Sequence, residues 1–322
     1  MRDLKNKLTS SKNTKNIQNR RGKSFGYQVL GFGAGGSVLP FIAATGGTIV
    51  EDGNFKIHIF TGPGTFCVSS AGTDAGSNAV DYMVVAGGGG ATYGGGGAGG
   101  FRNSVSCAGS LPLSVQGYPI TVGGGGTANP SARGANSVFS SITSTGGGAS
   151  GIPLPANAPG GSGAGGGYQD SPSPNAGGLG NTPPVSPPQG NNGGTGHGIY
   201  GTNNNGSGGA GGASAVGGPS GGSQGGGTGG AGAPTLIFGS TPTAPSYGES
   251  GPAPGRYFAG GGAGTNSGPA TPAKEGGVGG GGNGGPTVTS PGTSGSTNMG
   301  GGGGDFAGAG GSGIVVIRYK FQ

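Results

Sequence analysis

Glycine constrains this chain more than any other residue, because it makes up 92 of the 322 residues and is unevenly placed. Only 13 glycines precede Ala86, whereas 79 follow it, many of them in runs of four or more. Such runs supply no side chains for a hydrophobic core, and glycine loses more conformational freedom on folding than any other residue. The glycine-rich part is therefore either disordered or held together through its backbone.

Composition alone favours disorder, since Gly and Pro together form about a third of the chain and hydrophobic residues only 30%. Disordered chains are usually highly charged, however, and charged residues are only 7% here. Collagen requires glycine at every third position, and runs such as Gly94–Gly97 break that period. The remaining ordered alternative is a bundle of extended helices with three residues per turn, hydrogen-bonded side by side through bare backbone.

The positive charge lies in an N-terminal arm. Residues 1–25 carry a net charge of +7, and the remaining residues sum to −1. Such an arm suits an acidic protein surface, an anionic membrane or nucleic acid. Because it has almost no aromatic residue to stack on bases, nucleic acid is the less favoured partner. We predict an arm that docks onto other proteins through its basic residues, which are Arg2, Lys5, Lys7, Lys12, Lys15, Arg20, Arg21 and Lys23.

Strand-like stretches are separated by turn residues and bordered by glycine runs. Alternation places Phe55, Ile57 and Ile59 on one face of a strand and His58 on the other. The predicted strands are 48–50, 55–60, 65–68, 80–86, 118–122, 137–143 and 313–321, the first three forming an antiparallel meander. Each of the last four adjoins a glycine run, as expected if a sheet opens into extended glycine segments and closes again.

The predicted fold class follows from these patterns. It is mainly β, with a small antiparallel sheet or sandwich clamping a bundle of polyglycine segments that resemble polyproline II helices, and with little or no α-helix. The predicted organisation is a docking arm at 1–25, a connector at 26–45, a β-rich base with the first glycine runs at 46–145, the glycine bundle with its loops at 146–311, and a closing strand at 312–322.

The stretch from Val80 to Arg102 resembles the opening of glycine-rich domains in phage tail fibres and adhesins. Residues 118–126, 136–145 and 311–319 resemble later blocks of the same domain, in the same order. This resemblance, which covers roughly residues 46–322, implies attachment to a virion. It also implies polyglycine helices packed as a sandwich whose distal loops meet the host surface.

Motifs of enzymes and cofactor sites are incomplete in this chain. Residues 31–36 satisfy the dinucleotide-binding pattern, but Pro40 and a β-like pattern follow instead of the required helix. Gly22-Lys23-Ser24 lacks the upstream glycine of a phosphate-binding loop. The carboxylates of the body are scattered, so we predict no catalysis, no metal site and no cofactor.

Four polar or thiol side chains need a separate interpretation. His58 is expected to be a surface or hydrogen-bonded side chain, and His197, in a loop, a candidate for ligand contact. Cys67 and Cys107 are expected to be small buried thiols, or to pair if the chain is exported. The apolar stretch at 38–44 is too interrupted for a signal peptide, and no run is long enough to span a membrane.

Aromatic and polar islands within the glycine-rich part are the candidates for surface contact, since Tyr, Asn and Ser suit polar or sugar-like surfaces. The candidates are Tyr168, His197, Asn203, Asn204, Asn205, Tyr247, Arg256, Tyr257 and Phe258. A structural alternative is equally open for two of them: Tyr257 and Phe258 would pin the glycine bundle to the sheet.

The sequence therefore predicts a structural phage virion protein, such as a tail fibre, adhesin or head-fibre-like component, present in several copies. Its partners would be other virion proteins and a host glycan or outer-membrane protein, without membrane insertion. The alternative is a self-assembling extracellular or cell-surface filament protein, because the terminal strand at 314–321 would pair between chains if it formed an exposed edge.

Overall fold

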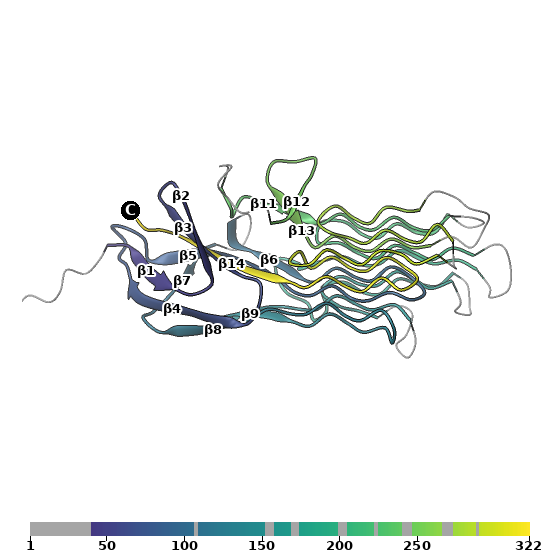
Figure 1. The fold of residues 1–322 in the computed structure, drawn as a ribbon, viewed down its shortest axis with the longest axis horizontal. Coiled ribbons are helices and arrows are strands. Elements are labelled where there is room, and N and C mark those ends of the chain that lie inside the picture. Colours follow the sequence, from purple (N-terminus) through teal and green to yellow (C-terminus); the bar gives the residue numbers. More distant parts are fainter. Residues whose placement is uncertain are drawn as a thin grey trace, which may run out of the picture. The chain divides into compact units, whose positions relative to one another are not determined.

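The structure is a computed structural model that describes residues 40–105, 109–151, 158–168, 174–198, 205–221, 225–239, 247–265, 273–287 and 290–322. The basic arm, residues 26–39 of the connector, Cys107, Asn203 and Asn204 lie outside these residues. The described residues belong to one compact unit, Pro40–Gln322. At one end of this unit are β-sheets, and from them glycine-rich segments extend side by side (Figure 1).

Two antiparallel sheets pack against each other as a sandwich. The first has the order β1 (Ile42–Thr45), β4 (Gly64–Ala71), β8 (Gly117–Thr121), β9 (Ser137–Phe139) and β10 (Ile142–Ser144). The second has the order β2 (Thr48–Asp52), β3 (Phe55–Phe60), β14 (Ile314–Lys320), β5 (Ala79–Val85) and β6 (Phe101–Asn103), with β7 (Leu111–Pro112) also paired to β5. This arrangement confirms the predicted β class.

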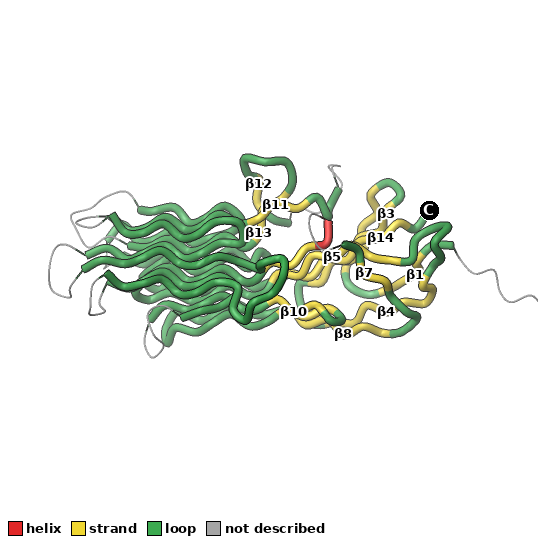
Figure 2. The backbone as a smooth tube through the Cα atoms, turned by 180° about the vertical axis from the view of Figure 1, so that it is seen from behind, coloured by secondary structure: helices red, strands yellow, loops and turns green. Residues whose placement is uncertain are grey.

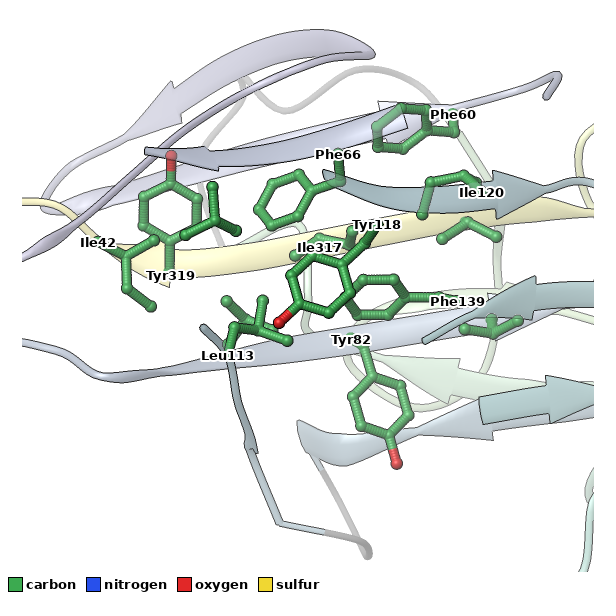
Figure 3. Packing of buried hydrophobic residues seen from close by; sticks show 14 residues of the cluster. Ile42, Phe60, Phe66, Tyr82, Leu113, Tyr118, Ile120, Phe139, Ile317 and Tyr319 are labelled. Carbon is green, nitrogen blue, oxygen red and sulfur yellow. The ribbon is translucent and has the colours of Figure 1, made fainter. Parts of the chain in front are cut away.

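The sandwich core lies between the facing surfaces of these sheets (Figure 3). The centre of strand β4 alternates, so that Phe66 and Val68 point inward while Cys67 is exposed. Phe66 packs edge-on against Phe139, with ring centroids 6.1 Å apart. Tyr82, Ile317 and Tyr319 of the second sheet face the same cluster. The expectation of a buried thiol at Cys67 is therefore wrong, because the pleat of β4 points its side chain to the outside.

The second sheet is covered on both faces. Its other surface carries Ile57, Met83 and Val316, which form a second core cluster with Phe238 and Phe258. Phe258 belongs to a third, small sheet with the order β11 (Ala233–Thr235), β13 (Arg256–Phe258) and β12 (Glu249–Ser250). Burial on both faces explains why β14 has the most apolar sequence among the strands.

Two details of the predicted strands are wrong. The stretch 137–143 is a hairpin of β9 and β10, because Ser140 takes a positive φ of 53° and reverses the chain. The stretch 65–68 does not complete a meander with β2 and β3. It belongs to β4, which crosses to the other sheet and pairs with β1 and β8. Phe60 and Phe66 thereby face one core from opposite sheets.

The glycine segments are joined by backbone hydrogen bonds with a period of three residues. The N–H groups of Gly87 and Gly90 donate to Ala135 and Ala132, which belong to one antiparallel neighbour. The N–H groups between them donate elsewhere: Gly88 to the segment at 308–311 and Gly89 to the segment at 94–100. Three residues per turn is the geometry of polyproline II, whose backbone groups all point outward.

The segment at 94–100 shows how closely these helices pack, because it is hydrogen-bonded to six neighbours. It donates to three segments: the N–H groups of Gly95, Gly96 and Gly97 donate to the carbonyls of Gly208, Gly303 and Gly148, respectively. It accepts from three others: the carbonyls of Gly95, Gly96 and Gly97 accept from the N–H groups of Gly165, Gly262 and Gly89, respectively. All seven residues of the segment are buried. The glycine-rich part is thus an ordered bundle, visible as undulating lines continuous with the sandwich strands (Figure 2).

Candidate functional site at the far end of the bundle

The far end of the bundle, opposite the sandwich, is where the segments turn back (Figures 1 and 2). Three of its turns are described throughout: 91–94, 127–131 and 305–308. Side-chain hydroxyls tie these turns together. Thr92 donates to the carbonyl of Ala128 at 2.8 Å, and Ser131 donates to that of Ser150 at 2.8 Å. The turn at 305–308 joins them, since the Ala307 N–H donates to the carbonyl of Ala91.

An aromatic pair lies at this end. The rings of Tyr93 and Tyr168 meet edge to face, with centroids 5.9 Å apart. Tyr168, one of the predicted contact residues, is only 6% exposed, so most of its surface is used in packing. Tyr93 is the more exposed partner and was missed by sequence reasoning. Its position between the first two glycine runs, 87–90 and 94–97, was the signal that could have found it.

A fully buried carboxylate, Asp305, lies beside these turns. Its Oδ2 accepts hydrogen bonds from the Ser207 hydroxyl and, at 3.3 Å, from the Thr265 N–H. Its Oδ1 accepts from the Phe306 N–H at 2.6 Å. Burial raises the pKa of Asp305 to about 6, although these hydrogen bonds oppose the shift. The sequence indicated nothing about this cluster, because its three members are far apart along the chain.

The predicted contact residues fall into two separate groups. Tyr168, His197 and Asn205 belong to the far end of the bundle, where His197 and Gly206 exchange backbone hydrogen bonds and Asn205 is 4% exposed. Tyr247, Arg256, Tyr257 and Phe258 belong to or adjoin the small sheet of β11, β13 and β12.

The second group mainly holds its own loop and packs against the sandwich. Arg256 donates through Nε to the carbonyl of Tyr247 at 2.8 Å and through Nη1 to Ser250. Tyr257, 5% exposed, accepts a hydrogen bond from the Ala253 N–H through its hydroxyl. Phe258 is fully buried against the second sheet. For Phe258, this burial favours the pinning role over surface contact.

His58 is buried in the sandwich, so the expectation of a surface position is wrong and that of a hydrogen-bonded side chain is confirmed. Its Nδ1 donates to the carbonyl of Gly46 at 2.7 Å, and its Nε2 accepts from the Tyr319 hydroxyl at 3.1 Å. The alternation itself is confirmed, because Ile57 and Ile59 lie in the second core cluster while His58 contacts Phe66 and Tyr319 on the opposite face. That opposite face is not exposed to solvent, because the second sheet is covered on both faces.

This burial predicts an acid-sensitive sandwich. Desolvation lowers the pKa of His58 from 6.5, so its contribution to stability is present above pH 6.5 and is lost as the pH falls through the lowered value. We expect His58→Gln to reduce the loss of stability between about pH 7.5 and about pH 5, measured by urea unfolding. His197→Gln, a change at the only other histidine, should leave the loss unchanged. Equal losses in wild type and His58→Gln would contradict this role.

The described residues hold no group of three or more His, Cys, Asp or Glu side chains that could bind a metal ion. No described helix is long and apolar enough to cross a membrane.

The fold and its far end together define a structural class: an antiparallel sandwich carrying a hydrogen-bonded bundle of glycine-rich segments. The family model described as the glycine-rich domain matches residues 61–320. The chain therefore belongs to the glycine-rich domain family. Searches of curated proteins and of solved structures found no match.

Proposed function

We propose that this protein is a structural component of a phage virion, such as a tail fibre, an adhesin or a head-fibre-like protein. The observation that supports this most is the division of the described unit into two ends. The chain enters the unit at β1, within the sandwich, whereas the turns of the glycine segments lie at the far end. An attachment protein needs one end that is fixed to the particle and another that faces the host, and the sandwich and the far end of the bundle suit these two roles.

The proposed contact with a host surface is made at the far end of the bundle. The turns at 91–94 and 127–131 carry hydroxyl, amide and aromatic groups and no charged side chain. Thr127 and Asn129 are exposed, and Tyr93 is partly exposed. A neutral surface of this kind suits a glycan or an uncharged polar region of an outer-membrane protein. Binding of labelled protein to host cells, with and without competing surface glycan, tests this contact.

The proposed docking partner of the basic arm is another virion protein. Deletion of residues 1–25 should abolish incorporation into particles, because the arm carries the net positive charge of the chain. The body should stay folded, as judged by circular dichroism, since the sandwich begins only at β1. A full-length variant with the eight basic residues changed to Gln separates the effect of charge from that of length. Normal incorporation of both variants would refute the docking role.

The alternative, a self-assembling filament protein, needs a free strand edge. The terminal strand does not supply one, because β14 is paired with β3 on one side and β5 on the other. An edge strand such as β2 would have to serve instead, where Ile49 is 44% exposed. Fibres formed by the purified protein without any virus would favour this alternative.

A further inference from the structure

Asp305 joins three segments that are distant in the sequence. Ser207 lies near the start of the described segment 205–213, Thr265 ends the segment 259–265, and Asp305 ends the segment 300–305. All three residues are fully buried. The Thr265 N–H also donates to the Ser207 hydroxyl oxygen at 2.7 Å, so the three residues form one hydrogen-bonded cluster.

The same cluster supports an unfavourable turn. Phe306 and Ala307 have positive φ angles of 63° and 77°, a region that residues with side chains rarely occupy. Such a conformation persists only where surrounding contacts hold it. The bond from the Phe306 N–H to Asp305 Oδ1 is one of these contacts, and the bond from Ala307 to Ala91 is another. Weakening the cluster therefore removes one of the contacts that hold this turn.

The cluster can be satisfied with Asp305 neutral or ionised. When the carboxyl group is neutral, its O–H can donate to the Ser207 hydroxyl, which can in turn donate to the Thr265 carbonyl at 3.2 Å. When it is ionised, the Ser207 hydroxyl turns to the carboxylate. No charged group among the described residues offsets the ionised state: the groups that act on Asp305 are Ser207, Thr265 and Phe306. A buried charge without a counter-charge costs free energy, so the closed cluster is less stable when Asp305 is ionised than when it is neutral.

We propose that Asp305 is a proton-sensitive clasp, which holds the ends of three glycine segments together firmly when its carboxyl group is neutral and less firmly when it is ionised. The stability of the closed far end would thus depend on pH through Asp305, which the surface-contact hypothesis does not use. The proposal concerns the described segment ends alone and stands whether or not the protein belongs to a virion.

The direction of the pH effect follows from linkage. The pKa of Asp305 is raised from 3.8 to about 6 when the cluster is closed. Its contribution to closure is therefore fully present below pH 3.8 and is lost as the pH rises through about 6. Across that window the opening constant should rise by roughly tenfold per pH unit, and by roughly a hundredfold in all.

Hydrogen exchange of the full-length protein measures this opening. Peptides that cover 259–265 and 300–308 should lose protection between about pH 4 and about pH 6, after correction for the intrinsic pH dependence of exchange. Asp305→Asn, which imitates the neutral form, should keep strong protection across this range. Glu275→Gln, which removes an exposed carboxylate elsewhere in the bundle, should behave as wild type.

A second variant keeps the proposal falsifiable if Asp305→Asn fails to fold. Because the Ser207 hydroxyl lowers the pKa of Asp305, Ser207→Ala should move the midpoint of the wild-type effect to higher pH. An NMR titration of the Asp305 carboxyl carbon in the unaltered chain gives the midpoint directly, expected at about 6. A midpoint below 4.5, or exchange at 300–308 that is independent of pH in wild type, would overturn the clasp.

Discussion

Replacing Gly96 by alanine should destabilise the protein by about 3 kcal/mol, because the added methyl group has nowhere to go. A Cβ at this position would lie 2.2 Å from the carbonyl oxygen of Gly89 and 3.0 Å from the backbone nitrogen of Gly303. Both obstacles are backbone atoms of hydrogen-bonded neighbours, so no rotamer change can relieve the overlap. The segment would have to separate from at least one neighbour and lose its hydrogen bonds.

Gly124→Ala is the matched control. A Cβ on Gly124, at the surface of the bundle, would have no heavy atom within 4 Å. This variant should differ from wild type by less than about 1 kcal/mol and can even be slightly more stable, because alanine restricts the unfolded chain. Urea unfolding of both variants gives the comparison. If Gly96→Ala were as stable as Gly124→Ala, the bundle could not be a close-packed backbone lattice in solution.

Truncation of Phe258 to alanine should cost about 3–5 kcal/mol, as expected for a fully buried phenylalanine. Its ring stacks on Phe238 with centroids 5.9 Å apart and belongs to one buried cluster with Met83, Val85 and Val316 of the second sheet. Loss of the ring removes the main apolar contact between the small sheet and the sandwich. Chemical unfolding measures the loss, and hydrogen exchange at 256–265 should show where it begins.

Tyr247→Ala provides the comparison for this second prediction. Tyr247 is stacked on the same Phe238 at 6.3 Å but is only partly buried, so its truncation should cost clearly less. The pair of variants separates pinning from surface contact. If Phe258→Ala kept wild-type stability but lost binding to host cells, the pinning role would be wrong and the contact hypothesis would gain support.

Several elements of the fold could be predicted from local patterns. Strands β3, β5, β8 and β14 coincide closely with predicted stretches, since β-branched and aromatic residues with period-two alternation mark a strand wherever it pairs. The direct passage from β5 into glycine, and from glycine into β14, was also predictable. Cβ-free segments were expected to pack at backbone distance, and the bundle confirms it.

The candidate site could be predicted only in part. Tyr168, His197 and Asn205 were recognised as islands in glycine, but their burial or backbone pairing was not foreseen. Asp305 and Ser207 are 98 positions apart, and nothing near either residue identifies the other. Tyr247 and Arg256 were grouped with the loop residues, although the fold separates them from the far end.

The sequence by itself determined where the longest strands form, and it required any ordered glycine run to associate through main-chain groups. Both properties depend on each segment's own side chains or their absence. Only the tertiary structure decided which segments are neighbours: that β4 leaves β2 and β3 and joins the first sheet, that both faces of β14 are covered, and that Asp305 meets Ser207. The physical reason is that every glycine N–H and carbonyl is chemically alike. The choice of partner is set by how the sandwich strands direct each segment and by the distant contacts that close it.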